Sequence, residues 1–593
     1  MRSFLLLLIL ILPFLFIKTA VAQPQTVFYI DPSASDPQEN GTEAHPFDSW
    51  EDILQKTPTR NFEPGNTYLQ KRGTIFYGRV FVGNRNGTAT NKIVFGAYGS
   101  GARPIINGRM PLTSSSWQGP DANGVYSYQV THPNEEVTVF YASSNPTIDP
   151  YGVEMPLNPQ GDTASPVDGT WSYIQGSRTI YYNPASSGPI PRASNTVFFY
   201  SARRTHIPFN IANSSYLEIR DFHLTRGAVH GLMASTTAHH IDIHNILADY
   251  NGSVSQKVAS DLLGRGNGIH IEGHDVNIYD SIGAWNEDNG GSVENTQSQT
   301  QKPYNVYFHR CTFNDNKDHG GTLRGAHVVA SLADISHGEF RNCLFERNGW
   351  QPTYGRYGLR VHSARGKISD SIIRNNYGPG VAFLSDASSI STAISISLEN
   401  NLIIDNGQGV EGTDVDPMTS RASLAVANYG RQNYIILNHN TIVSPGIGLN
   451  AYYNVPAIFQ LSNNVMISRA DVAMQLGRDL STQVYFRNND YQAGGAALLR
   501  ADQRDYNITS WNDRANVSND LNASPLFVDE SARDYHLRSS SPLVGAGVVT
   551  TLSRDIENNP RDTAPDIGAY EYQGGNQDSS SPKAPTGLRT LGN

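Results

Sequence analysis

The sequence has little cysteine and little charge for its length. Only Cys311 and Cys343 occur in 593 residues, so no disulfide framework holds the chain together. No closely spaced Cys or His residues indicate a zinc site, and no glycine-rich loop indicates a phosphate cradle. Charged residues make up 17% of the chain, below the usual quarter, which argues against a charge-laced helical bundle. The formal net charge of −10 excludes a general nucleic-acid binder.

What the chain has instead is glycine, asparagine, serine and tyrosine. The 53 Gly and 30 Tyr residues favour strands joined by many turns. A chain of this length predicts several domains or one long repeat architecture. Because disulfides are absent as a framework, stability must come from a large apolar core.

The first 22 residues have the pattern of a signal peptide. An apolar run extends from Phe4 to Ile17, and Ala20 and Ala22 form a small-x-small cleavage site. The run is too short to cross a bilayer comfortably, and no later stretch is longer. The sequence therefore predicts a secreted or periplasmic protein without a membrane span, cleaved near Ala22.

A repeat emerges when short apolar segments are aligned on the polar residue that ends each of them. Nine of these ten anchor residues are Asp or Asn, and their spacing varies between 24 and 40 residues. After each anchor come a second apolar pair, an Asn-rich turn, a Gly and a third strand, so each repeat forms one three-stranded coil. The anchors are Asp221, Asn245, Asp280, Arg310, Asn342, Asp370, Asn400, Asn440, Asn464 and Asn489.

Side chains at equivalent positions of the coils are expected to stack. Cys311 and Cys343 both follow an anchor on neighbouring coils, which predicts stacked buried thiols. A set of asparagines falls in one turn, where amides can hydrogen-bond from coil to coil; these are Asn286, Asn316, Asn348, Asn376 and Asn406.

The repeat resembles the right-handed parallel β-helix of pectate-lyase-like secreted proteins, over about residues 92–110 and 200–495. The resemblance implies an all-β, single-stranded β-helix with an N-terminal cap and carbohydrate as the ligand. Residues 111–199 break the period with aromatic β-hairpins and predict a small inserted β-subdomain. The predicted organisation is a signal peptide (1–22), cap and first coils (23–110), insertion (111–199), β-helix (200–495), closing segment (496–573) and linker-like tail (574–593).

The third strand of each coil predicts a polar stripe. If Leu232, Ile269, Val293, Leu323, Leu359 and Val381 all point inward, their neighbours point outward because side chains alternate along a strand. A polar outer face is ordinary for a solvated strand; the alternative is a functional site, because charge is more concentrated on these coils than solubility requires. The stripe then contains His270, Glu294, Arg324 and Arg360, with Glu272 and His362 two residues further along.

The turn before this strand carries a second candidate cluster. Aligning residues 282–291 with 312–321 matches Asp288 with Asp318, next to Glu287 and His319. Carboxylates on adjacent coils repel one another unless a proton, a cation or an Arg neutralises them. A catalytic or cation-binding role explains such a cluster; the alternative is turn aspartates that cap backbone amides.

Two reactions fit these residues. A lyase that cleaves a uronic-acid polysaccharide by β-elimination neutralises the sugar carboxylate, removes the adjacent proton and protonates the leaving oxygen. Calcium on Asp288, Asp318 and Glu294 suits the first task. Arg324 or His319 is then the candidate base, with Arg360 binding the carboxylate.

The segment from Glu294 through Lys302 to Arg324 is also similar to the Glu…Lys…Arg spacing of the chondroitinase B and alginate lyase family. That resemblance implies base and acid roles for Lys302 and Arg324. The chain lacks the family's Glu-x-Glu pair before the Lys.

The alternative enzyme is a glycoside hydrolase that uses Asp288 and Asp318, and a non-catalytic carbohydrate-binding β-helix is the third possibility. The polygalacturonase motif set and the Tyr-Gly-x-Asp-Pro-His motif of mannuronan epimerases are absent from the sequence. Trp285 and Tyr357 are candidates for stacking on sugar rings. The predicted partner is a polysaccharide, with calcium as the only candidate cofactor, and the sequence carries no signal for the oligomeric state.

Overall fold

The computed structural model describes most of the chain after the predicted signal peptide, which itself lies outside the described residues. The described ranges are 26–130, 137–143, 153–193, 196–202, 206–252, 266–294, 303–325, 337–350, 356–385, 394–407, 421–428, 433–451, 457–477 and 484–574.

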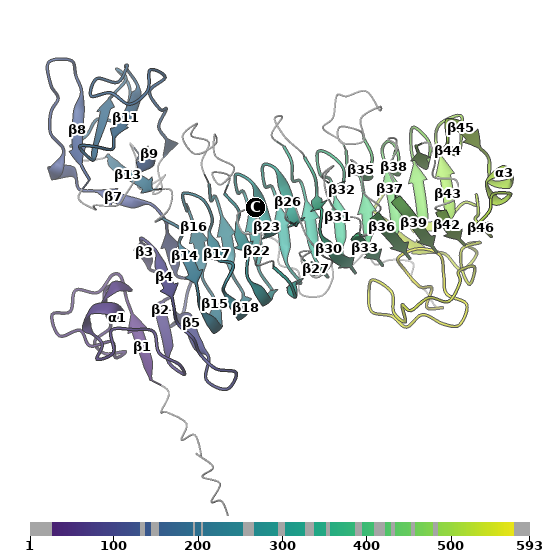
Figure 1. Ribbon diagram of the computed structural model, residues 1–593, viewed down its shortest axis with the longest axis horizontal. Helices are drawn as coiled ribbons and strands as arrows, with labels where there is room; N and C mark the ends of the chain where they lie inside the picture. The colour runs from purple at the N-terminus through teal and green to yellow at the C-terminus, as the bar shows by residue number, and fades with distance from the viewer. Residues whose placement is uncertain are drawn as a thin grey trace, which may run out of the picture.

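Three long sheets wind together through these ranges as a single-stranded parallel β-helix, which confirms the predicted fold class (Figure 1). Each coil contributes one strand to sheet A, then one to sheet B, then one to sheet C. Strands pair with the equivalent strand one coil away, as in β21 with β24, β22 with β25 and β23 with β26. Only β45 runs antiparallel among the described strands of the three sheets.

Sheet A comprises β1 (Val27–Ile30), β2 (Thr67–Lys71), β5 (Ile93–Tyr98), β15 (Ser215–Arg220), β18 (His239–His244), β21 (His274–Tyr279), β24 (Val306–His309), β27 (His337–Arg341), β30 (Arg365–Ser369), β33 (Ile394–Glu399), β36 (Asn433–Asn438), β39 (Ala457–Ser462), β42 (Val484–Arg487) and β46 (Val517–Ser518). Sheet B comprises β3 (Ile75–Tyr77), β6 (Ile105–Asn107), β16 (His223–Thr225), β19 (Leu247–Asp249), β22 (Ile282–Ala284), β25 (Thr312–Asn314), β28 (Leu344–Glu346), β31 (Ile372–Arg374), β34 (Leu402–Ile404), β37 (Thr441–Ser444), β40 (Val465–Ser468) and β43 (Asp490–Ala493). Sheet C comprises β4 (Val80–Gly83), β14 (Phe209–Ala212), β17 (Leu232–Ala234), β20 (Ile269–Ile271), β23 (Asn289–Glu294), β26 (His319–Arg324), β29 (Leu359–His362), β32 (Val381–Ser385), β35 (Leu424–Asn428), β38 (Leu449–Ala451), β41 (Met474–Leu476), β44 (Leu499–Ala501) and β45 (Arg504–Tyr506).

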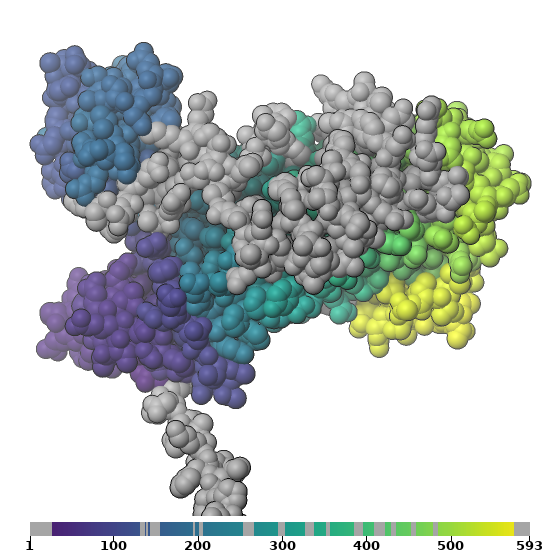
Figure 2. All heavy atoms as spheres, in the orientation of Figure 1, coloured from purple at the N-terminus to yellow at the C-terminus, as the bar shows by residue number. Residues whose placement is uncertain are grey.

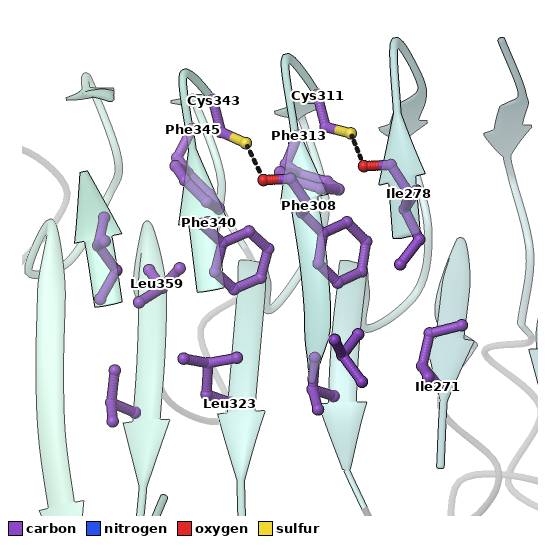
Figure 3. Close-up of a cluster of buried hydrophobic side chains, with 14 of the residues drawn as sticks. Ile271, Ile278, Phe308, Cys311, Phe313, Leu323, Phe340, Cys343, Phe345 and Leu359 are labelled. Carbon is purple, nitrogen blue, oxygen red and sulfur yellow. Dashed lines mark hydrogen bonds between the residues drawn. The ribbon is translucent and has the colours of Figure 1, made fainter. Parts of the chain in front are cut away.

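The axis of the β-helix is a continuous apolar core. Phe308 stacks on Phe340 and Phe313 on Phe345, with ring centroids 4.8 and 5.2 Å apart (Figure 3). The two thiols are free and buried, as predicted, and each contacts a backbone carbonyl one coil away. Each fully buried aliphatic or aromatic side chain of this kind stabilises the fold by about 1.5–3 kcal/mol. Stacked apolar side chains therefore supply the stability that disulfides do not.

Two kinds of turn connect the sheets, and both rely on left-handed residues. Asp280 and Arg310 follow strands of sheet A with φ of 52° and 51°, and the other predicted anchors up to Asn400 are also left-handed, with φ between 53° and 69°. The last three anchors were placed one residue too far along. The left-handed residues there are His439, Asn463 and Asn488, because each is followed by a second polar residue that the alignment selected instead.

The predicted asparagine ladder is confirmed in the turn between sheets B and C. The Oδ1 atom of Asn316 accepts both the backbone N–H and the Nδ2 of Asn286, at 3.1 and 3.0 Å. Its own Nδ2 donates to the carbonyl of Gly283 and to Asn348. Asn376 and Asn406 continue the pattern. Each amide thus satisfies buried backbone groups of two coils, which side chains without both donor and acceptor could not do.

A column of glycines makes room for this ladder. A Cβ added at Gly320 would lie 2.7 Å from the Nδ2 of Asn348 and 2.6 Å from the Gly358 carbonyl. Gly290 and Gly358 stand in the same relation to Asn316 and Asn376. The glycine near the start of β20, β23, β26 and β29 is therefore a packing requirement of the ladder.

Both ends of the core are covered. The short helix α1 (Glu51–Lys56) follows Trp50, whose buried ring packs against Phe95 and Phe222 at the first coils. At the other end, Trp511 of α3 (Ile508–Asn512) packs on Phe486 of the last coil. None of the helices in the described ranges is long and apolar enough to cross a membrane.

Strands β7 to β13 are inserted between β6 and β14 and form two small antiparallel sheets around Trp117, Trp171 and Phe140. The inserted strands and the cap project separately from the same end of the molecule (Figure 2). Beyond the last coil, β47 and β48 pair, and the following segment packs back on sheet B, with Arg561 buried against Glu571. The bounds of these strands and of the 3-10 helix are β7 (Met110–Leu112), η1 (Ser114–Ser116), β8 (Tyr126–Gln129), β9 (Val137–Ser143), β10 (Val153–Glu154), β11 (Thr170–Ile174), β12 (Thr179–Asn183), β13 (Val197–Ala202), β47 (Phe527–Asp529) and β48 (Asp534–Leu537).

The glycine column gives the first prediction. Gly320→Ala forces a methyl group against the Asn348 amide and the Gly358 carbonyl, so we expect a loss of about 1–3 kcal/mol of stability. Thermal unfolding followed by circular dichroism measures it. Gly176→Ala is the matched control, because nothing lies within 4 Å of the added Cβ there. Equal midpoints for the two variants would contradict the packing role of the column.

Candidate functional site

The turns into β23 and β26 place Asp288 and Asp318 on neighbouring coils. The Asp318 N–H donates to the Asp288 carbonyl at 3.2 Å, and Asn289 pairs with His319 in the sheet. This register confirms the alignment of residues 282–291 with 312–321. Asp318 is buried and Asp288 is half-buried. The backbone geometry therefore makes the two aspartates vertical neighbours at the start of sheet C.

A lysine partly neutralises the acidic turn. Lys317 forms an ion pair with Glu287 one coil away. Burial nevertheless raises the pKa of Glu287, against the opposing effect of the lysine charge. On the following coil, the register places Arg356 in line with Asp318, since Gly321 pairs with Leu359. The turn thus changes from acidic to basic along the helix axis.

The prediction of a single polar stripe on sheet C is wrong, because the outward residues form two rows. Ile269 pairs with Gly291, and Leu359 pairs with Gly321. Val293 and Leu323 therefore lie two residues further along, in the row of Ile271 and Val361. The inward position is a glycine on two coils because sheet B brings Phe313 and Phe345 there. A Cβ at Gly291 would lie 2.6 Å from the Phe313 ring. One row contains His270, Ser292, Thr322 and Arg360, and the other contains Glu272, Glu294, Arg324 and His362.

His270 stands at the centre of a buried hydrogen-bond network. Its Nδ1 lies 2.9 Å from the Nδ2 of Asn267 and 2.8 Å from the Oγ of Ser292. Its Nε2 faces the carboxylate of Glu272 at 3.5 Å. Burial opposes a charge on the ring, but the interaction with Glu272 and the charge of Glu294 outweigh it, so the pKa of His270 is raised. Glu272 therefore favours the charged form of the His270 ring.

A second buried histidine lies against the first. The rings of His230 and His270 are parallel, with centroids 4.2 Å apart. Burial and the neighbouring His270 lower the pKa of His230 well below its usual range. His230 is therefore a neutral ring that packs against His270, the ring that can take up a proton.

Sequence reasoning missed three buried polar residues of this network: His230, Asn267 and Asn289. Asn289 donates to Asn267 at 2.8 Å and to Glu294 at 3.3 Å, and it accepts from Thr322. A signal was present, because each residue directly precedes the column glycine of its coil, as does His319. These residues hold Glu294 and His270 in position.

The charged ends of the two rows meet on β26 and β29. The guanidinium of Arg324 lies 3.9 Å from Glu294, and Arg360 donates to the Nδ1 of His362 at 2.8 Å. Because arginine only donates, Nδ1 of His362 is the acceptor and its Nε2 carries the proton. The Nε of Arg360 is buried and has no hydrogen-bond partner among the residues that the structure describes.

The remaining predicted residues lie at the margins. His319 is buried, stacks on Tyr357 and accepts the Tyr357 backbone N–H on Nδ1 at 3.4 Å. Trp285 lies at the corner between sheets B and C, 43% exposed, and stacks on Tyr250. Lys302 lies outside the described residues.

The carboxylates predicted to bind calcium have the right chemistry but do not converge. Hard oxygen donors suit Ca²⁺. Within the described ranges, however, ligand atoms of three or more such residues come within 4.8 Å of one another only at Glu39, Asp48 and Asp52, on the cap. Glu294 is instead turned toward Asn289 and Arg324. Asp288, Asp318 and Glu294 therefore do not form a ready ligand set.

No family model matches the sequence, and no curated protein matches it significantly. Solved structures similar to this chain include the pectate lyase Pel9A (14% identity, 92% of this chain and 96% of that chain covered, TM-score 0.44). A rhamnogalacturonan lyase (12%, 87% and 95%, 0.40) and XylC in complex with xylose (11%, 92% and 98%, 0.41) are also similar. Identities and TM-scores at this level assign no reaction to this chain.

The His270 network predicts a pH-dependent stability. A histidine whose folded pKa is raised stabilises the protein below its unfolded pKa of about 6.5, and the contribution is lost as the pH rises through the folded pKa. Glu272→Gln removes the partner charge. We expect the variant's thermal midpoint to fall further below wild type at about pH 5.5 than at about pH 8. The exposed substitution Glu43→Gln is the control, and an equal deficit at both pH values would contradict the assignment.

Proposed function

We propose that this protein is an exported enzyme that cleaves a uronic-acid-containing polysaccharide by β-elimination on the outer face of sheet C. One observation carries the proposal. Two guanidinium groups, Arg324 and Arg360, stand on adjacent coils next to a row of two buried carboxylates, Glu272 and Glu294. Anion binding and proton transfer, the two needs of the reaction, are thus provided side by side.

Arg360 and Arg324 bind the sugar carboxylate in this proposal. A guanidinium presents paired donors that match a carboxylate. The buried Nε of Arg360, which has no partner within the described ranges, gains one when the carboxylate binds. Neutralising the carboxylate makes the adjacent ring proton more acidic. The arginines therefore serve binding and activation, not proton abstraction, since a guanidinium does not deprotonate in proteins.

Glu294 is the proposed base. Its carboxylate is held by the Asn289 amide and lies beside Arg324, where the bound uronate would be. It takes the proton from the carbon next to the carboxylate, the electron pair forms a carbon–carbon double bond, and the glycosidic carbon–oxygen bond breaks. The leaving oxygen takes a proton from solvent water, and Arg360 holds the His362 ring in place through its Nδ1. His270 keeps Glu272 and Glu294 from repelling each other.

A glycoside hydrolase is the second candidate, and the register supports it. Glu272 and Glu294 are equivalent residues of adjacent strands, about 4.8 Å apart along the axis. This approaches the separation of about 5–5.5 Å between the carboxyls of retaining enzymes. Asp288 and Asp318 are related in the same way. A non-catalytic carbohydrate-binding role would not explain why the buried carboxylates Glu272 and Glu294 lie side by side.

The activity prediction separates the candidates. We expect the purified protein to release unsaturated uronate, detected by ultraviolet absorbance, from at least one uronic-acid polysaccharide. Glu294→Gln should lower kcat by about 10²–10⁴-fold because it removes the base. Arg360→Lys should mainly raise KM, because a lysine cannot bind a carboxylate with two parallel donors. Arg487→Lys, at an exposed position on sheet A, is the matched control.

Other outcomes would overturn the lyase assignment. New reducing ends without absorbance, lost in Glu294→Gln and Glu272→Gln, would indicate the hydrolase. Binding without turnover that persists in Asp288→Asn combined with Asp318→Asn would indicate a carbohydrate-binding protein. Full activity of Glu294→Gln would exclude this carboxylate as the base.

Calcium is tested separately. Asp288, Asp318 and Glu294 would be its ligands, and bound Ca²⁺ would neutralise the substrate carboxylate. Because their carboxylates do not converge, we expect turnover to persist in excess chelator. Loss of activity on chelation, restored by Ca²⁺ but not in Asp318→Asn, would show instead that the acidic turn rearranges around the ion.

A further inference from the structure

A groove of about 390 Å³ lies on the outer face of sheet A, where β15, β18, β21 and β24 pair. Its volume lies within the range of small-ligand sites. Sheets A and C form different faces of each coil, and none of the lining residues belongs to sheet C. The groove is therefore separate from the proposed active site.

The groove is built on a further column of left-handed residues. Tyr216, His240, Asp275 and Asn305 occupy the same register position on four successive coils, and all four have φ between 52° and 56°. Left-handed conformations are uncommon outside glycine, and least favourable for bulky residues such as Tyr216. All four side chains line the groove. Strain of this kind persists where the surrounding structure enforces it, often at binding sites.

Aromatic rings stack along the helix axis, both in the groove and at the residues that directly precede its lining residues. Tyr216 stacks on His240, with centroids 4.6 Å apart. His239, His274 and Tyr304 form a second stack on adjacent coils, with separations of 5.0 and 4.4 Å. Tyr304 is 43% exposed at the end of this stack. Such ring faces pack well against the apolar faces of sugar rings.

The polar groups in the groove are oriented by their neighbours. Asn277 donates to Asp242 at 3.0 Å, and Lys92 pairs with the same carboxylate. Asn305 donates to Asp275 at 2.9 Å. Burial raises the pKa of Asp275, but its hydrogen bonds to Asn305 and His274 outweigh this and lower it. Fixed carboxylate acceptors next to amide donors suit hydroxyl groups, while two carboxylates against one lysine disfavour an anion.

We propose that this groove is a non-catalytic binding site for an uncharged saccharide unit of a polysaccharide. In this proposal the sugar ring stacks on Tyr307, at the groove wall, and on the adjoining aromatic side chains. The hydroxyl groups of the sugar bind Asp242, Asp275 and Asn277. The inference rests on the proposed function only in taking a polysaccharide as the ligand class. It assigns to sheet A a role in holding the polymer that sheet C cleaves.

Affinity electrophoresis in native gels tests this site. The probes are three uncharged polysaccharides, xylan, β-galactan and hydroxyethylcellulose, with polygalacturonate as the anionic comparison. We expect retardation in at least one uncharged gel. Tyr307→Ala and Asn277→Ala should each weaken the binding by several-fold to about tenfold. Asn277 is exposed, so its variant keeps the test valid if Tyr307→Ala does not fold.

Two controls separate this site from the active site. Tyr485→Ala, a 42% exposed tyrosine on the same face but remote along the helix, should leave retardation unchanged. Glu294→Gln should lower turnover by about 10²–10⁴-fold and keep retardation. No retardation in any uncharged gel, unchanged retardation in both groove variants, or loss in Glu294→Gln would overturn the inference. Full activity of Glu294→Gln would overturn the proposed function and leave the groove result standing.

Discussion

An asparagine amide in the turn between sheets B and C joins each of six successive coils to its neighbour, from Asn251 to Asn406. Its oxygen accepts hydrogen bonds from the backbone N–H and the amide of the asparagine on the preceding coil. Its nitrogen donates to a backbone carbonyl of the preceding coil and to the asparagine oxygen of the next coil. Buried backbone groups that the strands do not pair are satisfied in this way. The ladder requires a glycine opposite each amide, since a Cβ there would lie within about 2.8 Å of it. The spacing of these coils and the position at which their sheet C strands begin depend on this pairing of asparagine with glycine.

The candidate active site is built on the same constraint. Asn267, Asn289 and His319 each directly precede a glycine of the column, so the ladder fixes where their side chains begin. From there the strands extend outward with Glu272, Glu294, Arg324 and His362 on successive coils. A repeat that is uniform in its core thus carries a charge gradient on its surface, acidic on two coils and basic on the next two.

The repeat was predictable because its rules are local. A left-handed turn takes Asp or Asn readily, an amide ladder needs Asn at a constant position, and apolar pairs mark the inward faces. Errors arose where two residues satisfied the same local rule. His439 with Asn440 is one case, and the paired glycines 290–291 are another, because the second glycine occupies an inward position that the Phe313 ring fills.

By itself, the sequence determined the parallel coil, the stacked thiols, the asparagine ladder and the neighbourhood of Asp288 and Asp318, since each follows from spacing along one chain. Only the tertiary structure decided which outward residues share a row, that His230 stacks on His270, and that the Arg360 Nε has no hydrogen-bond partner in the part of the chain that the structure describes. The reason is physical. Periodicity specifies which positions are equivalent, but the direction of a side chain depends on what the other two sheets place against it.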